Sequence, residues 1–539
     1  MPLPQGVNRR ALGAAALGAA ALIVNGRPAS AGPTAGPASG TPTRAPATRR
    51  AIPTATAERL PRRSSPAWHL ARRASLAPTA TLAAQIAGRT PRQWLEEQLN
   101  PAGVADPRVE AIIAKYYPVV NAETGAEVRT STADRPWEAA PALVRAIVLR
   151  QVFGNRHLLE SMTEFWSDQI FVGAQGKSES YVAHFNHTVL RRHALGRFAD
   201  LLLAALRHPA LLVYLDNDAN SRDNPNENLG REVLELHTVG VGNFTETDVR
   251  QSTLLLTGHS YEWQSLAYRY RPWDHHVGPL TIMNFTDANA SSADGEALLA
   301  RYATHLARHP ATARRIATRL CRRFVSDTPP AALVDRLAAT YQTSDTDIRP
   351  VLRELFNSAE FAASPGQKWR RPQESMNGML RALNPADPVL LKDPRTDPWG
   401  TLNHQLWLLG LGYHQPRSWP YVDGFPDVAS AWVTTNILRG VWNAAESIAG
   451  GWDKEIAIAP LAKTFPVTVG ETVTGAVRRI AGDLTGWEWA ERDLVPVAAM
   501  LYSWGRDAPP PSATVTAEMI ETLPHVIRLI MSSPYFQMR

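Results

Sequence analysis

Residues 214–240 combine six acids, five asparagines and one histidine between two apolar segments. Counted from Asp216 as the first position of a calcium loop, five ligand positions hold side chains with oxygen atoms: Asp216, Asp218, Asn220, Asn224 and Glu227. Calcium and other hard divalent cations prefer such oxygens, which predicts a metal site. Two residues depart from the pattern, since Ser221 replaces the turn glycine and Asp223 replaces an apolar residue. The alternative is a polar turn in which Asn226 caps the next helix.

A second group of charged residues follows on the same segment. Glu227, Arg231 and Glu235 are spaced four residues apart, so a helix would place one guanidinium between two carboxylates. If this face is buried, Glu232 and His237 are candidates for proton transfer or for metal binding, and Arg231 and Glu235 complete the candidate catalytic group. The alternative is a structural row of ion pairs on the helix surface.

The elements that carry these residues are predicted to be helices. Leu229, Val233 and Leu236 form one apolar stripe at helical spacing, and Gly240 can end that helix. The same period recurs along the chain, whereas alternating strand patterns are scarce, so helices are expected at 136–155, 157–171, 188–206, 246–257, 297–308, 310–324, 330–341, 348–357 and 514–531. The sequence therefore predicts an all-α fold, a large multi-helix globular domain with long ordered loops.

The N-terminal part differs from the rest in composition. In residues 1–31, two arginines precede a weakly apolar run and a small-residue cleavage site, which predicts a twin-arginine-like signal peptide and an exported protein. Residues 32–63 are rich in proline, alanine and arginine, and we expect a disordered linker. Residues 64–539 are expected to form the helical domain, with one body or two lobes. No later apolar run is long enough for a transmembrane anchor.

The distribution of charge and the single cysteine argue against a nucleic-acid-binding protein and against an internal disulfide. Residues 1–63 hold nine of the 56 lysines and arginines but one of the 50 acids, so the remainder has a net charge of −2. The basic character belongs to the N-terminal tail, and we expect no nucleic acid partner. The single cysteine, Cys321, cannot form an internal disulfide and is expected to be a buried thiol of a helix.

Aromatic residues in a loop indicate a different kind of site. The chain has 16 tryptophans, and four aromatic residues flank a loop rich in proline, glycine and aspartate: Trp419, Tyr421, Phe425 and Trp432. Such side chains can stack on sugar rings, so an envelope glycan is a candidate ligand. The alternative is that these rings pack between loops and helices.

Several segments resemble the large bacterial family known as domain of unknown function 1800. The segments are NENLGREVLELHTVG (226–240), FWSDQIFV (165–172), LARHPATARRIATRLCRRFV (306–325) and VDGFPDVASAW (422–432), and the resemblance covers most of residues 65–539. The motif residues that match are Asn226, Glu227, Asn228, Arg231, Glu232, Glu235 and His237. The resemblance implies an exported protein, often encoded beside a sulfatase-like partner, and it implies no established activity.

The chain departs from the family pattern at two places. Where the family has Asn-His-Phe after Phe-Trp-x, this chain has Asp168, Gln169 and Ile170, so the histidine is lost. Where the family has His-Asp-x-Gly-x-Lys, His276 replaces the acid and Leu280 replaces the lysine. If those groups form a shared site, the departures at Gln169, His276 and Leu280 alter or abolish it. They also leave Asp168, His275 and His276 as alternative ligands.

Two functions follow from these patterns. The first is a metal-associated exported protein that acts on an envelope polymer or ester, with the acidic motif helix as its site and calcium or another divalent metal nearby. The second is a non-catalytic binding or assembly protein of the cell envelope, in which the polar helix fixes the fold and aromatic loops contact a glycan or a partner. The sequence leaves open whether the protein is an enzyme.

Overall fold

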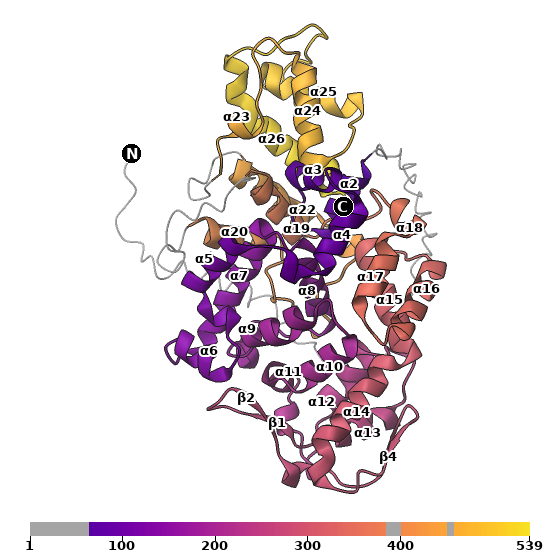
Figure 1. Cartoon of the computed structure of the whole chain (residues 1–539). Helices are drawn as coiled ribbons and strands as arrows, with labels where there is room; N and C mark the ends of the chain where they lie inside the picture. Colours follow the sequence, from indigo (N-terminus) through magenta and orange to yellow (C-terminus); the bar gives the residue numbers. More distant parts are fainter. Residues whose placement is uncertain (1–63, 384–399, 450–457) are drawn as a thin grey trace, which may run out of the picture. The chain divides into compact units, whose positions relative to one another are not determined.

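A helix buried on all sides lies at the centre of the packing. Every side chain of α8 (His157–Gln169) is buried, because the helix contacts α2 (Pro66–Ala74), α4 (Pro91–Leu99), α7 (Ala139–Phe153) and the π-helix η5 (Asn186–Arg191) (Figure 1). The computed structural model describes residues 64–383, 400–449 and 458–539. The predicted signal peptide (1–31) and linker (32–63) therefore lie outside the described residues.

The other long helices form from amphipathic segments whose apolar stripes join one continuous core. In chain order they are α3 (Ala80–Ala87), α5 (Pro107–Tyr116), α6 (Gly125–Ser131), α10 (Phe198–Leu206), α13 (Glu246–Leu255), α14 (Gly295–Arg308), α15 (Pro310–Phe324), α16 (Ala331–Thr343), α17 (Ile348–Phe356), α19 (Pro372–Ala382), α20 (Thr401–Leu411), α22 (Thr435–Ala449), α24 (Val473–Thr485), α25 (Glu491–Ser503) and α26 (Leu523–Ser532). In the part of the chain that the structure describes, no helix is both long and apolar enough to cross a bilayer.

Short elements connect these helices. The short helices are α9 (Val182–Phe185), α11 (Pro209–Tyr214), α12 (Glu227–Glu232), α18 (Ala359–Ala362), α21 (Ala429–Trp432), α23 (Leu461–Thr464) and α27 (Pro534–Gln537). The strands form two antiparallel hairpins, of β1 (His259–Glu262) with β2 (Ala267–Tyr270) and of β3 (Leu280–Ile282) with β4 (Phe285–Asp287). The all-α prediction is confirmed, because these hairpins are the only sheets among the described residues.

Two of the predicted helices differ from the structure. The predicted helix 188–206 is divided, because η5 ends at Arg191 and α10 begins at Phe198, whose backbone N–H donates to Thr346 O. The predicted helix 514–531 begins only at Leu523 as an α-helix, since Thr514 forms a β-bridge with Thr472 and a 3₁₀ turn follows. Contacts with distant segments override the local pattern at both places.

Other details of the sequence prediction are confirmed. Asn226 is the N-cap of α12, as the polar-turn alternative predicted. The predicted helix 246–257 begins at Glu246, where Thr245 forms a capping box with Asp248. Cys321 is a buried free thiol, and burial raises its pKa to about 12.

A buried network of ion pairs connects the helices. The carboxylate of Glu374 on α19 forms ion pairs with Arg323 at 2.8 Å, Arg539 at 3.1 Å and Arg371 at 3.6 Å. Arg371 also pairs with Asp168 at the end of α8, at 2.6 Å. These arginines hold the pKa of Glu374 at about 2, although burial alone would raise it. The network therefore joins α8, α15 and α19 with the C-terminal residue.

We expect Glu374→Gln to lower the free energy of unfolding by ~3–5 kcal/mol, because it leaves buried guanidinium groups without their shared carboxylate. Urea unfolding at neutral pH measures the loss. Glu360→Gln is the control, since Glu360 pairs with Arg336 near the surface and should contribute less than about 1 kcal/mol.

The same substitution has a defined pH signature. The pKa of Glu374 falls from its ordinary 4.5 to about 2 on folding, so its stabilisation is complete above pH 4.5 and is lost as the pH falls towards 2. The stability of the Glu374→Gln variant should therefore fall less steeply across this window. Parallel acid-unfolding curves for the native protein and the variant would contradict this role of Glu374.

Candidate functional site

The acidic loop before α12 is held mainly by hydrogen bonds within the protein. Asp216 has a left-handed backbone (φ 54°), and its side chain accepts a hydrogen bond from Lys177 Nζ at 2.5 Å. Asn220 is buried; its Nδ2 donates to Asn217 Oδ1 and Thr253 O, and its Oδ1 accepts from Asn226 N–H. The loop thus has the features of the polar-turn alternative.

The predicted metal ligands differ in their exposure and in their hydrogen-bond partners. Asp218 is half-buried, Asn224 is exposed in a turn with Ser221, and the exposed Glu227 pairs with Arg231. Within residues 64–383, 400–449 and 458–539, no three His, Cys, Asp or Glu side chains are arranged so that they could hold a metal ion. Metal binding by this loop stays a prediction.

The ion pairs of Arg231 differ from the predicted row. Arg231 pairs with Glu227 at 3.3 Å, but its second carboxylate is Glu246 on α13, at 2.7 Å, and not Glu235. The reason is a change of helix type, because α12 continues as the π-helix η7 (Val233–His237), whose wider turns displace Glu235 from the row. Arg231 therefore belongs to a surface ion-pair group on α12 and α13.

Glu232 and Glu235 lie on another side of the motif helix. Both are half-buried. Burial, and then the carboxylates of Glu235 and Asp423, raise the pKa of Glu232. Glu235 in turn acts electrostatically on Arg315 of α15. Glu232 is thus coupled electrostatically to Asp423, and Glu235 to Arg315.

His237 is buried and lies against the end of α8. Its Nδ1 donates to Gln169 O at 3.0 Å, while Gln169 Nε2 donates to the backbone oxygens of Leu236 and His237. Burial lowers the pKa of His237 to about 4, so the ring is neutral at neutral pH. Its Nε2 is buried and has no hydrogen-bond partner among the described residues. Gln169 therefore fixes the C-terminal end of η7 to α8.

A cavity of about 330 Å³ lies beside Leu236, the residue between Glu235 and His237 in the sequence. Its walls come from the end of α8, from η7, from α15 and from the loop 419–428. The residues that line it are Phe165, Asp168, Leu236, Arg315, Arg319, Arg322, Arg323, Trp419, Asp423, Gly424, Phe425, Pro426, Asp427 and Val428. We call it the arginine cavity.

Three arginines on α15 give this cavity positive charge. Arg315, Arg319 and Arg322 follow one another at spacings of four and three, so one helix face presents them all. Arg315 donates to Leu236 O and Arg319 to Asp168 O, which are uncharged oxygens. Burial lowers the pKa of Arg319 to about 10, which leaves it charged at neutral pH. In the described parts of the chain, none of the three forms an ion pair.

The loop 419–428 closes the cavity opposite α15. Asp168 Oδ1 accepts from the backbone N–H of Phe425 at 3.2 Å, which ties the loop to α8. Trp419 Nε1 donates to Asp423 Oδ1 at 2.8 Å, and the Trp419 ring lies 5.2 Å from that of Phe425. Of the aromatic residues singled out in the sequence, Trp419 and Phe425 line the cavity, Tyr421 is exposed, and Trp432 packs on His414.

The second place of departure from the family pattern is elsewhere. His275 is buried and bonds to Thr257 O and Asn289 Oδ1, and Leu280 is buried in β3. Neither these residues nor the half-buried His276 line the arginine cavity. The departures at residues 168–169 and 276–280 therefore belong to separate surroundings.

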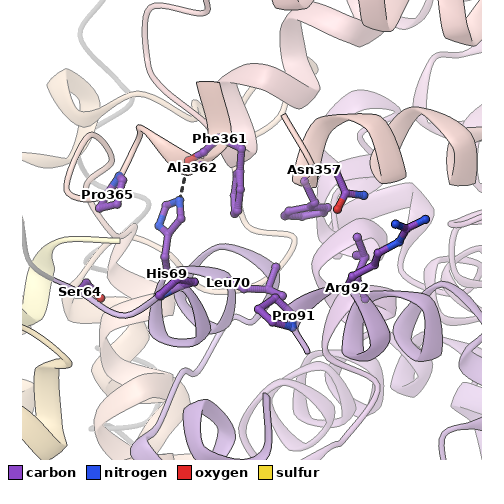
Figure 2. Close-up of a pocket in the computed structure, with 12 residues that line it drawn as sticks. Ser64, His69, Leu70, Pro91, Arg92, Asn357, Phe361, Ala362 and Pro365 are labelled. Carbon is purple, nitrogen blue, oxygen red and sulfur yellow. Dashed lines mark hydrogen bonds between the residues drawn. The ribbon is translucent and has the colours of Figure 1, made fainter. Parts of the chain in front are cut away.

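Sequence reasoning missed the arginines of α15. The sequence does contain a signal for them, because three of the five arginines in the segment RRIATRLCRR, namely Arg315, Arg319 and Arg322, lie at helical spacings of four and three. The contrast with another cavity shows why they matter. A cavity of about 180 Å³ beside His69 has mostly apolar walls such as Leu70, Phe361 and Pro91, and one arginine, Arg92, lines it (Figure 2).

Comparison with known proteins assigns the chain to a family but does not indicate an activity. The family model described as "Protein of unknown function (DUF1800)" matches residues 69–538. No curated protein and no solved structure matches the chain.

We expect Gly424→Ala to destabilise the loop of the arginine cavity. Gly424 has φ +74°, and an added Cβ would overlap the backbone of Asp168. Gly470→Ala is the matched control, because Gly470 has φ +95° but open space around it. Thermal unfolding should show a loss for Gly424→Ala that exceeds the control by about 1–3 kcal/mol. Equal losses would show that the contact with Asp168 does not constrain the loop.

Proposed function

On the premise that this chain belongs to the DUF1800 family, to which no function is attached, we propose that it binds an anionic glycan of the cell envelope in the arginine cavity. One observation carries the proposal: three half-buried arginines of α15 face a cavity and have no ion-pair partner among the described residues. Guanidinium groups that line a concave site and lack a direct ion-pair partner favour sulfate, phosphate or carboxylate groups, to which they donate paired hydrogen bonds.

The other walls suit a sugar. Trp419 and Phe425 offer ring faces for stacking on the apolar face of a pyranose, and Asp423 offers a carboxylate to its hydroxyl groups. A volume of about 330 Å³ suits one or two charged sugar residues rather than a long segment of polymer. The ligand class is therefore an acidic oligosaccharide, held by its charged group on α15.

The remaining parts of this proposal come from the sequence. The signal peptide of residues 1–31 would deliver the protein to the periplasm or outside the cell, where acidic glycans occur. A sulfatase-like partner would suit a protein that binds sulfated sugars. Calcium bound by Asp216, Asp218 and neighbouring oxygens would stiffen the segment before α12, and it is not required for the arginine cavity.

Hydrolysis of the bound glycan is a second candidate function. Glu232 is half-buried, and burial together with neighbouring carboxylates raises its pKa. A carboxyl group with a raised pKa can act as a general acid, and Asp423 provides a second carboxylate near it. Arg231, by contrast, forms ion pairs with the surface acids Glu227 and Glu246.

We expect Arg319→Gln to weaken binding of a sulfated oligosaccharide about tenfold, or ~1.4 kcal/mol, because one charged donor is lost. Calorimetry with sulfated, uronic-acid and neutral oligosaccharides of equal length measures the effect. Arg314→Gln is the matched control, since Arg314 lies on the same helix but is exposed and pairs with Asp335. Its affinity should equal that of the native protein.

The outcome against the proposal is equally defined. If the neutral oligosaccharide binds as tightly as the charged ones, or if Arg314→Gln and Arg319→Gln lose the same affinity, the arginine cavity is not the binding site. Affinity for the charged ligands should also fall as salt rises from about 50 to about 200 mM, as screening requires.

For hydrolysis, we expect Glu232→Gln to abolish release of reducing ends while leaving oligosaccharide affinity within about twofold, because a neutral amide cannot donate the proton. Reducing-end assays on acidic glycans measure the activity, and calorimetry measures the affinity. Glu227→Gln is the control, since Glu227 pairs with Arg231 at the surface. Activity that persists in the Glu232→Gln variant would leave binding alone as the function.

A further inference from the structure

Three buried arginines outside the arginine cavity have few partners. The side chains of Arg72, Arg73 and Arg370 are almost fully buried, with exposures of 1%, 0% and 2%. Arg72 and Arg73 lie on α2, and Arg370 precedes α19. The ring of Trp487 lies over the Arg72 guanidinium and next to Gly366, in the segment 364–370 that also holds Ser364, the partner of Arg73, and Arg370 itself, so the three side chains share one region of the core. We call them the core arginines.

The hydrogen bonds of the core arginines go only to uncharged oxygens. Arg72 donates to Thr485 O at 2.6 Å and to Ser64 Oγ, and Arg73 donates to Ser364 O at 2.6 Å. The guanidinium of Arg370 lies 4.5 Å from the ring centre of Phe536. Six nitrogen atoms are buried and have no hydrogen-bond partner among the described residues: Arg72 Nε, Arg73 Nε and Nη1, and Arg370 Nε, Nη1 and Nη2.

The nearby carboxylates are already bound to other cations. Glu374 pairs with Arg323, Arg371 and Arg539. Asp427 pairs with Lys368 at 3.0 Å and with Arg323 at 3.3 Å. Glu374 and Asp427 attract Arg73, and Glu374 attracts Arg370, but both acids are already in direct contact with other cations. They therefore do not serve as counter-ions of the core arginines.

Loss of a proton does not resolve this imbalance. Burial lowers the pKa of all three arginines, to about 10 for Arg370, but a guanidinium in a protein keeps its proton at neutral pH. A buried charge without a counter-ion costs several kcal/mol, and a water molecule can accept a hydrogen bond but cannot neutralise the charge. An anion would do both.

We propose that the core arginines bind a small monovalent anion, with chloride as the ion available in most surroundings. A single-atom anion accepts hydrogen bonds from several directions. It therefore does not need to lie in the plane of any one guanidinium group, as a carboxylate would. The ring of Trp487, 4.0 Å from the Arg72 guanidinium, and that of Phe536 cover faces of two of these groups and leave their N–H edges for the ion. The site is structural, since none of the three side chains is open to solvent.

Chloride-dependent stability tests this site in the full chain. Thermal unfolding is measured at constant ionic strength while chloride, raised from about 1 to about 100 mM, replaces gluconate. A ligand that binds only the folded state raises Tm with its concentration, and we expect a saturable rise of about 2–3 °C. Crystals grown in bromide should show an anomalous peak among Arg72, Arg73 and Arg370.

Two variants separate this site from the arginine cavity. Arg370→Met, which removes three of the six unpaired nitrogens, should abolish the chloride dependence. Arg319→Gln, which alters the arginine cavity, should keep it. The opposite pattern, or a Tm independent of chloride together with no bromide peak in the native protein, overturns the proposal. If Arg370→Met does not fold, the bromide peak in the native protein decides alone.

Discussion

The arrangement of the arginine cavity depends on the ion pairs that the buried carboxylate of Glu374 forms with three arginines. It holds Arg323 of α15, Arg371 at the start of α19 and Arg539 after α27, three segments that are far apart in the sequence. Burying ions is costly, and only close mutual contact offsets that cost. Since Arg371 also holds Asp168, separation of α8 from α15 and α19 would leave charges buried without partners. The ion-pair network thus fixes two of the walls of the arginine cavity.

The same helix that enters the network also supplies the cavity. Arg323 turns inwards to Glu374 and Asp427, whereas Arg315, Arg319 and Arg322 line the cavity and bind only backbone oxygens or nothing in the described structure. Arg323 reaches two buried carboxylates, whereas the other three arginines do not, because the buried carboxylates of Glu374, Asp168 and Asp427 already pair with other cations. Positive charge therefore remains at the cavity, where an external anion can reach it. This is a physical reason for assigning ligand binding to α15 rather than to the acidic motif helix.

Local patterns in the sequence predicted what depends on near neighbours. The apolar stripes predicted most helices, and Asn226 predicted the start of α12, because a cap needs only the adjacent backbone. The local pattern did not predict the π-helix η7. Glu235 was therefore expected to pair with Arg231, whereas in the structure Glu246 forms that ion pair. The arginine cavity was missed for a similar reason: its walls come from four segments that lie far apart along the chain.

Asp168 and Gln169, the residues expected to depart from the family pattern, each have a structural role beside the arginine cavity. Asp168 accepts from Arg371 with one carboxylate oxygen and from the backbone of Phe425 with the other, so it joins the ion network to the loop 419–428. An asparagine amide offers only one acceptor oxygen, so the acid can satisfy both donors where asparagine would satisfy one fully. Gln169 bonds two backbone oxygens of η7, a task that needs both N–H groups of its amide. Both residues therefore hold walls of the arginine cavity in place.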